Sequence, residues 1–255
     1  MNKSGHTVLI TGGAAGIGLA LAKQFVRSGN QVIITGRDLG KLGNAKAYDS
    51  GISAYGCDLR SEAEVSVLVN RLYDEHPKLS VLVNNAGIQY NYSFLTGNAA
   101  DDKKQDMQQA MHNRIAEETH VNFIAPVQLT AALLPLLARQ DEAAVVNVSS
   151  GLGLTPKKSA PVYCATKAGI HLFTQALRYQ LEQTNIRVFE IIPPIVDTEM
   201  TKGRGRGKIT PDQLAEQFWT YYVLDRLEIP IGKVKLLRWL NRLAPSVAQA
   251  VLKNS

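Results

Sequence analysis

The stretch Thr11-Gly-Gly-Ala-Ala-Gly-Ile-Gly18 lies between an apolar run, Val8-Leu-Ile10, and an amphipathic segment from about Ile17 to Ser28. This order of apolar run, glycine-rich turn and helix is typical of the first βα unit of a dinucleotide-binding fold. Glycine permits a tight turn and lets a pyrophosphate approach the backbone at the helix N-terminus. A strand-to-helix turn without a ligand is the alternative, but its place in the first βα unit favours binding.

The same alternation continues along the chain. Strand-like runs are expected at 31–35, 53–56, 81–83, 143–148 and 186–192, and helices at 40–48, 62–76, in a stretch ending near 139 and after 160. The pattern predicts an α/β fold of the Rossmann type, a doubly wound parallel sheet with helices on both faces. No repeat or linker interrupts it, so we expect one domain over 1–255, in which 199–255 form a substrate lid and a basic C-terminal segment.

Composition excludes several classes of protein. The 255 residues are 45% hydrophobic and 20% charged, which is ordinary for a globular chain. From the sequence we expect no secretory segment before the first strand and no apolar run long enough to span a bilayer. Cys57 and Cys164 form no paired motif, so a cytoplasmic location is expected. The five histidines lack ligand spacing, and no metal site is expected.

The net charge of +6 is concentrated at one end of the chain. Residues 1–201 hold 18 Lys/Arg and 18 Asp/Glu, whereas residues 202–255 hold 10 and 4. Uniform basicity would suggest nucleic acid as a partner. This asymmetry indicates instead a feature of the C-terminal segment, and we expect no nucleic-acid binding.

A second motif places Tyr163 four residues before Lys167. On a helix this spacing puts the phenol and the ammonium on one face, where the Lys is expected to lower the Tyr pKa. Tyr163 is therefore a candidate proton donor or acceptor. With nine Tyr in the chain, roughly half a match to Tyr-x-x-x-Lys is expected by chance, so the pair needs support from other motifs.

That support comes from four further motifs in chain order. They are Asn84-Asn-Ala-Gly87, Asn122 within His-Val-Asn-Phe, Val146-Asn-Val-Ser-Ser150, and Pro193-Pro-Ile-Val-Asp-Thr198. Together with the Gly-x-x-x-Gly-x-Gly turn and Tyr163/Lys167, they make the chain resemble the short-chain dehydrogenase/reductase family, of the "classical" type, over at least residues 7–201. The chain is also similar to a subgroup of oxidoreductases associated with D-alanyl–teichoic acid operons.

The resemblance implies a reaction and its residues. It implies an NAD(P)-dependent enzyme that transfers a hydride between nicotinamide and a carbonyl or secondary alcohol, a small-molecule substrate. Tyr163 would be the acid/base, Lys167 would lower its pKa and hold the nicotinamide ribose, and Ser150 would hydrogen-bond the substrate oxygen. Asn122 would position a water that links Lys167 to solvent. Alternatives are that Ser150 only caps a turn and that Asn122 is a helix-bending residue.

Cofactor choice depends on the end of the second strand, Thr35-Gly-Arg-Asp38. Gly36 occupies the usual place of an NAD-type acid and Arg37 follows, so we predict NADP(H) over NAD(H), with Asp38 as the residue that could reverse this. The residues expected to contact cofactor are Gly12, Ala14, Ala15, Gly16, Ile17, Gly18, Arg37, Asp58, Leu59, Asn85, Ala86, Gly87, Tyr163, Lys167, Pro193, Ile195, Val196 and Thr198.

Three features remain outside the motifs. The polar stretch 91–119 is longer than the family commonly has, and we favour an extra helical turn on the surface over part of the substrate rim. The glycine- and cation-rich 201–208 could be a lid for an acidic substrate or a solvated loop. Residues 233–243 combine four cations with Leu and Trp, which predicts an amphipathic helix on the body or a partner subunit; an anionic membrane is the less favoured alternative.

Two readings of the whole chain therefore compete. The enzyme is favoured, and the family often forms homodimers or homotetramers through the helices that bear Asn122 and Tyr163. The alternative is a non-catalytic dinucleotide-sensing regulator on the same fold, which typically loses the Tyr or the Lys. This chain keeps both.

Overall fold

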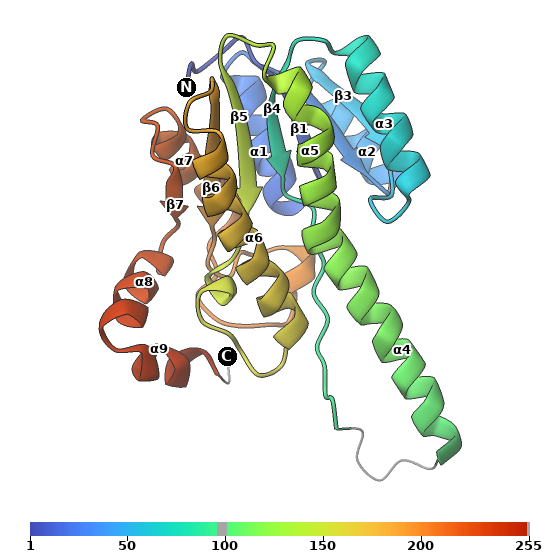
Figure 1. The fold of residues 1–255 in the computed structure, drawn as a ribbon, viewed down its shortest axis with the longest axis vertical. Helices are drawn as coiled ribbons and strands as arrows, with labels where there is room; N and C mark the ends of the chain where they lie inside the picture. The colour runs from blue at the N-terminus through green and yellow to red at the C-terminus, as the bar shows by residue number, and fades with distance from the viewer. Residues whose placement is uncertain (96–100, 254–255) are drawn as a thin grey trace.

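The structure is a computed structural model that describes residues 1–95 and 101–253, without the side chains of 101–104. Its centre is a seven-stranded sheet in the order β3-β2-β1-β4-β5-β6-β7, in which every neighbouring pair is parallel (Figure 1). The strands are β1 (Thr7–Thr11), β2 (Gln31–Gly36), β3 (Ile52–Gly56), β4 (Leu79–Asn84), β5 (Ala143–Val148), β6 (Ile186–Ile192) and β7 (Glu228–Pro230). The doubly wound fold predicted from the sequence is confirmed.

Helices cover both faces of the sheet and extend past its lower edge in Figure 1. The α-helices are α1 (Gly16–Arg27), α2 (Leu39–Tyr48), α3 (Glu62–Glu75), α4 (Asp101–Thr119), α5 (Ala125–Leu137), α6 (Pro161–Gln180), α7 (Pro211–Tyr222), α8 (Val234–Leu243) and α9 (Pro245–Leu252). A π-helix η1 (His120–Ile124) joins α4 to α5, and the short 3-10 helices are η2 (Gly151–Gly153) and η3 (Glu199–Thr201).

The core lies in two layers, one on each face of the sheet. Side chains alternate between the faces along each strand, so Val8 and Ile10 enter one layer and Leu9 the other. The first layer is completed by α1, α2 and α7, and the second by α3, α5 and α6. All six residues of β4 and all six of β5 are buried, as expected for strands covered on both sides.

Local sequence signals explain several element boundaries. Helix α7 begins after Thr210, which forms a capping box with Gln213, and Pro211 occupies its first turn. Pro230 lies in β7 at the edge of the sheet, where a residue without an amide N–H is tolerated.

The polar stretch 91–119 contains a helix of 19 residues, α4, which is longer than the single extra turn expected from the sequence. Helix α4 continues the line of α5 and projects away from the sheet (Figure 1), and residues 105–110 are all exposed. Residues 96–100 lie outside the described part of the chain.

One helix of the described residues, Gln105–Leu137, is long and apolar enough to cross a membrane by length and composition alone. Half of its apolar window is buried inside the fold, where α5 packs on the sheet. The sequence analysis found no such run because the apolar part of this segment is mainly the 13 residues of α5, which follow the polar α4.

Candidate active site

The glycine turn after β1 is shaped by contacts that exclude side chains. Gly12 has a φ of +64°, and a Cβ there would lie 3.0 Å from the Cα of Ala86. A Cβ on Gly18 would overlap the carbonyl oxygen of Gly12, so the first turn of α1 can pack on the loop only with glycine at this position. Gly16 has a φ of +52°, and a Cβ there would lie 3.1 Å from the Thr198 methyl group.

Side chains from two strands hold this turn in place. The Asn85 amide Nδ2 donates to the Thr11 carbonyl at 2.9 Å and to the Gly12 carbonyl at 3.2 Å. The Thr11 hydroxyl oxygen accepts from the backbone amides of Asn85 at 3.0 Å and Ala86 at 3.1 Å. Sequence reasoning named Asn85 and Ala86 but missed Thr11, although its place at the end of a buried strand was a usable signal.

The N-terminus of α1 fits a dinucleotide phosphate. Its N-cap, Ala15, has no side chain that could cap the first-turn amides. Ala14, Ala15 and Gly16 line a cavity of about 410 Å³ that is also lined by Lys41 and Glu199, which pair at 2.5 Å. Free amides and the helix dipole favour a negative charge at this point. The residues present therefore fit the pyrophosphate of a nicotinamide dinucleotide.

Tyr163 and Lys167 both lie on α6 near the carboxyl end of β5. The Lys167 Nζ is 5.8 Å from the centroid of the Tyr163 ring and donates to the Val148 carbonyl at 2.7 Å. Lys167 is 5% exposed. The Val148 carbonyl at the end of β5 therefore holds the Lys167 ammonium beside the Tyr163 ring. The two side chains share one face of α6, as the four-residue spacing predicts.

The pKa values in this pair are displaced by burial. Burial raises the pKa of Tyr163 to about 12, while a hydrogen bond from Ser150 acts in the opposite direction. Burial lowers the pKa of Lys167 to about 8, opposed by the buried carboxylate of Glu190. The Tyr163 pKa is therefore raised and not lowered as expected from the sequence, because loss of solvation outweighs the Ser150 hydrogen bond that acts against it.

Ser150 follows β5 and faces the same site. Its side chain is 8% exposed, and its hydroxyl oxygen accepts from the Leu152 amide at 3.1 Å. The turn-capping alternative is therefore real, but it uses only the oxygen as an acceptor and leaves the hydroxyl proton available. The following amide, Gly151 N–H, donates to the Pro193 carbonyl at 3.0 Å and so ties the β5 and β6 ends together.

Asn122 occupies the middle of the π-helix η1. Its Oδ1 accepts from the Ile88 amide and its Nδ2 donates to the Ile88 carbonyl, both at 2.8 Å. The Nδ2 also lies 3.3 Å from the Thr166 hydroxyl on α6. A Cβ placed on Gly87 would be 3.3 Å from Asn122 Oδ1 and 3.7 Å from Lys167 Nζ, so both groups converge on this glycine. A π-turn at such a place is frequent in functional sites.

The end of β2 carries the residues expected to select the cofactor. The Arg37 side chain is half exposed, and its Nη1 lies 3.6 Å from Glu117. Asp38 caps α2, where its Oδ1 accepts from the Lys41 amide at 2.9 Å. The cap holds the carboxylate on its own helix, so the possibility that Asp38 turns toward a ribose finds no support in this geometry.

A second arginine stands beside Arg37. Arg60 pairs with Asp58 at 2.5 Å and with Glu117 at 2.7 Å, and its guanidinium lowers the pKa of Asp58. Arg60 was missed by sequence reasoning because it lies outside the named motifs, although Asp58-Leu-Arg60 is contiguous. The side chain of Leu59 is buried in the core, so only its backbone is available.

The segment after β6 forms the floor of the site. Val196 makes an isolated parallel bridge with Ile209, and the Ile195 carbonyl accepts from the Ile209 amide at 3.4 Å. Thr198 begins η3, where its hydroxyl oxygen lies 3.4 Å from that of Thr201. This segment thus brings Ile195, Val196 and Thr198 to the edge that also holds the glycine turn.

A buried carboxylate completes the rim. Glu118 is 0% exposed and accepts from the Tyr92 hydroxyl at 2.7 Å and from the Tyr90 amide at 3.1 Å. The Tyr92 amide donates to the Ser159 carbonyl at 2.9 Å, just before α6, and Glu118 raises the pKa of Tyr163 slightly. Both ends of the stretch 91–119 therefore reach the site. Glu118 was missed, although it lies one helical turn before Asn122.

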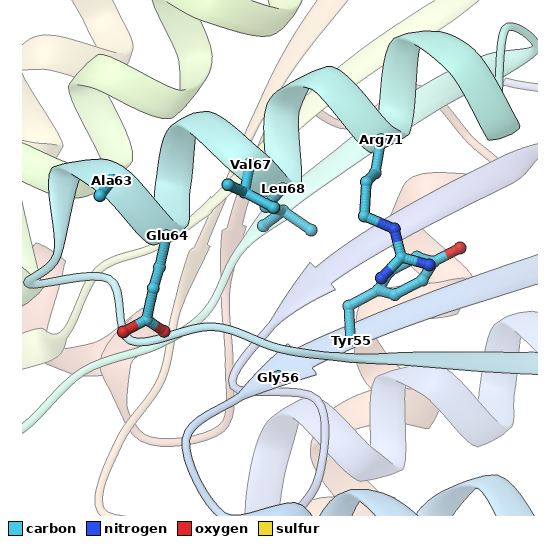
Figure 2. A pocket seen from close by; sticks show the side chains of 7 residues that line it. All are labelled: Tyr55, Gly56, Ala63, Glu64, Val67, Leu68 and Arg71. Carbon is cyan, nitrogen blue, oxygen red and sulfur yellow. The ribbon is translucent and has the colours of Figure 1, made fainter.

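A further pocket, of about 200 Å³, lies away from these residues. It is lined by α3 and the edge strand β3, with the Arg71 guanidinium 4.2 Å over the Tyr55 ring (Figure 2). None of the predicted catalytic residues lines it, so it is separate from the site described above.

Comparisons with known proteins agree with this geometry. A family model described as short chain dehydrogenase matches residues 6–208. The uncharacterized oxidoreductase DltE of Bacillus subtilis (strain 168) is 41% identical over 229 residues, which cover 89% of this chain and 86% of that protein. This relative agrees with the subgroup expected from the sequence.

Two solved structures share the fold. A short-chain dehydrogenase from Sphingobium yanoikuyae in complex with NADPH has a TM-score of 0.78 at 25% identity, over 96% of this chain and 94% of that chain. A short chain dehydrogenase/reductase from Burkholderia phymatum in complex with NAD has a TM-score of 0.79 at 20% identity, over 95% and 96%. These two proteins bind different cofactors.

Proposed function

This chain belongs to the short-chain dehydrogenase/reductase family and is an NAD(P)-dependent oxidoreductase; from that premise we propose that it reduces a carbonyl substrate with NADPH, with Tyr163 as proton donor. The observation that carries this proposal is the buried Lys167 ammonium, 5.8 Å from the Tyr163 ring and facing Gly87 together with Asn122. A regulator that only senses the dinucleotide is the alternative, and it needs neither group.

The proposed mechanism assigns one task to each side chain. When bound, the nicotinamide supplies the hydride or accepts it. Tyr163 gives its phenolic proton to the carbonyl oxygen as the alcohol forms, and Ser150 donates a hydrogen bond to the same oxygen. Lys167 holds the nicotinamide ribose and places positive charge below the phenol as negative charge develops there.

Asn122 is a positioning residue in this proposal. Both of its amide atoms are used to fasten the loop after β4 to η1 and α6, through Ile88 and Thr166. Its Oδ1 also faces the same glycine as Lys167, which is compatible with the water between them that the family resemblance implies. Loss of Asn122 would let the floor beside Lys167 shift.

The pKa of Tyr163 determines which form of the phenol is present near neutral pH. With a pKa raised to about 12, the phenol keeps its proton near neutral pH. Reduction needs that proton, whereas oxidation needs the phenolate. At neutral pH Tyr163 is therefore in the protonated form that our proposed role as proton donor requires.

NADP(H) is proposed as the cofactor because of the end of β2. Gly36 offers no acidic side chain, Asp38 is engaged as a helix cap, and Arg37 is half exposed with one carboxylate at 3.6 Å. An arginine with free donors suits a ribose 2′-phosphate. Measuring kcat/KM with NADPH and NADH tests this proposal, and a preference for NADH would refute it.

Unpaired cations at the entrance favour an acidic substrate. The Arg204 Nη1 is buried without a hydrogen-bond partner among the described residues. Lys157 is half-buried nearby, and burial, assisted by the charge of Arg204, lowers its pKa. Lys157 also lies beside Cys164, the residue after Tyr163, since the Lys157 amide is 3.5 Å from the Cys164 Sγ. A carbonyl compound with a carboxylate or phosphate would satisfy both cations.

The test is a panel of ketones and aldehydes, neutral and anionic, followed by the loss of NADPH absorbance. Turnover by the natural chain and its loss in Tyr163→Phe, with NADPH binding retained in both, supports the proposal. Tight NADPH binding without turnover across the panel would favour the regulator.

Location and assembly are proposed on general grounds. Both cysteines are free and buried, which is compatible with a cytoplasmic location. A homodimer or homotetramer is proposed from the family resemblance, because members of the family often assemble through the helices that bear Asn122 and Tyr163. Light scattering of the purified chain measures this directly.

A further inference from the structure

Helix α8 has apolar side chains on two opposite sides. Its inner side packs beside the active site, because a Cβ on Gly151 would lie 3.3 Å from Val234 and 3.5 Å from Leu237. The Asn241 amide also donates to the Leu154 carbonyl at 3.2 Å. One apolar side therefore suffices to attach α8 to the fold, and it does so next to Ser150.

The outer side of α8 is apolar and uncovered. Leu236 is 70% exposed, Trp239 64% and Leu243 74%. Spacings of three and four residues place these side chains on one side of the helix, one turn after another. The exposed apolar residues continue into α9 with Val247 and Val251. Single exposed leucines are common, but a contiguous apolar stripe marks an interaction surface.

Cations flank this apolar stripe on both sides. At about 100° per residue, Lys235 and Arg242 lie beside Trp239, whereas Lys233 lies on the other side of the stripe. All three are exposed, and no carboxylate of the described chain pairs with them. Lys235 stands over the Tyr221 ring at 5.2 Å, which leaves its charge uncompensated.

We propose that α8 and α9 bind an anionic lipid bilayer, lying parallel to its surface with Leu236, Trp239 and Leu243 inserted among the lipids. An apolar stripe bordered by lysine and arginine is the arrangement that interfacial helices use, with the apolar face about 5–10 Å deep at the acyl boundary. Tryptophan suits this boundary because its ring is amphipathic.

A second copy of the chain fits this surface less well. A two-fold interface formed by the stripe would bring the cations of one copy against those of the other, and such like-charge contacts are costly. Anionic lipid headgroups would neutralise the cations on both sides of the stripe. The loop 202–208 adds charge on the same side, since a Cβ on Gly207 would lie 3.0 Å from Lys233 Nζ.

Bilayer binding would also bring the mouth of the active site to the membrane surface. Helix α9 is tied to the loop before α6, where the Lys158 amide donates to the Lys253 carbonyl at 3.0 Å, and α8 touches Gly151. In Figure 1 both helices lie at the end of the molecule where α6 begins. Resting on the proposed function, this placement predicts an anionic carbonyl substrate that resides in the bilayer.

The test uses the full chain and needs no substrate. Co-sedimentation is measured with vesicles of phosphatidylcholine alone and with vesicles containing phosphatidylglycerol. The chain has two Trp, so Trp219→Phe leaves Trp239 as the only tryptophan, whose emission is excited selectively above the tyrosine absorption band. We expect binding to the anionic vesicles, a blue shift of Trp239 emission and its quenching by brominated lipid.

Two variants identify the surface. The triple change Leu236→Ser, Trp239→Ser and Leu243→Ser is expected to lower the bound fraction at least about tenfold. A matched control replaces three other exposed apolar residues, Leu39→Ser, Leu172→Ser and Leu224→Ser, and should bind as the natural chain does. NADPH affinity of each variant reports its folding.

Several results would overturn the inference. They are absence of binding, no change in Trp239 emission with vesicles, equal binding to phosphatidylcholine alone, and undiminished binding of the α8 variant. A dimer that dissociates in the α8 variant, without vesicle binding, would assign this surface to self-association. Because no activity is measured, failure here leaves the proposed oxidoreductase function untouched, and failure of turnover leaves bilayer binding untouched.

Discussion

The predicted cofactor site has a reactive end, which would hold the nicotinamide, and an adenosine end. The two ends use charge in different ways. At the reactive end, Lys167 is buried, and burial moves the pKa values of both Tyr163 and Lys167 toward the neutral forms. At the adenosine end, Arg37 and Arg60 are about half exposed and share the Glu117 carboxylate. Burial thus adjusts proton affinity where chemistry occurs, whereas exposure leaves full charges available for recognition.

The largest expected effect comes from the buried end. Lys167→Met removes the charge beneath Tyr163 and the donor to the Val148 carbonyl, and we expect kcat/KM to fall by about 10³. Lys78→Met, at an exposed lysine, is the matched control and should leave kcat/KM unchanged. Steady-state rates with NADPH measure both variants. If kcat/KM fell by less than threefold in Lys167→Met, roughly 0.6 kcal/mol, it would contradict the claim that the buried end has the larger effect.

The pH dependence tests the displaced pKa of Tyr163. Oxidation of an alcohol needs the phenolate, so a pKa of about 12 predicts a rate that still rises with pH throughout the alkaline range. Reduction needs the protonated phenol, which is fully present below that pKa, so Tyr163 should not limit it there. Rates in both directions across the pH range give the comparison. An oxidation rate that levels off near neutral pH would show that Lys167 lowers the tyrosine pKa after all.

A smaller effect is expected at the exposed end. Arg37→Gln removes a charged donor, and we expect NADPH affinity to weaken by about 2 kcal/mol, about thirtyfold, with NADH affinity little changed. Arg226→Gln, at an exposed arginine between α7 and β7, serves as control. Titration of each variant with both cofactors measures the effect. An equal loss of affinity for NADPH and NADH would mean that Arg37 supports the fold of the loop and does not contact the ribose 2′-phosphate.

The smallest effect concerns Asp38. Asp38→Ala removes the N-cap of α2 and should lower the free energy of unfolding by about 1 kcal/mol, without changing the preference for NADPH. Asp141 is exposed and caps no helix of the described chain, so Asp141→Ala should change the free energy of unfolding by less than about 0.5 kcal/mol. Urea denaturation measures both. A selective loss of NADH binding in Asp38→Ala would place Asp38 on the ribose and weaken the NADP(H) proposal.

The sequence predicted most of the fold because its signals are local. Glycine in the turn after β1, the apolar runs of β4 and β5 and the capping residues of α7 each dictate structure within a few positions. The spacing of Tyr163 and Lys167 likewise fixed their common face on α6.

What the sequence did not predict depends on contacts between distant segments. Glu118 becomes a buried acceptor only when Tyr90 and Tyr92 fold against it, and Arg60 meets Glu117 across 57 positions. The pKa of Tyr163 was misjudged because spacing reveals the neighbouring charge and not the solvent lost on folding. The uncovered side of α8 was equally hidden, since apolar positions on both sides of a helix look like core until their exposure is known.

The central claim, that Tyr163 protonates a carbonyl reduced by NADPH, is tested most directly by a single-turnover experiment. Enzyme is loaded with NADPH deuterated at C4 and mixed with the best ketone or aldehyde of the panel, for the natural chain and for Tyr163→Phe. The account predicts deuterium at the carbinol carbon with the natural chain, and a rate about 10²–10⁴ lower in the variant at unchanged NADPH affinity. A variant that transfers deuterium at the natural rate would contradict it.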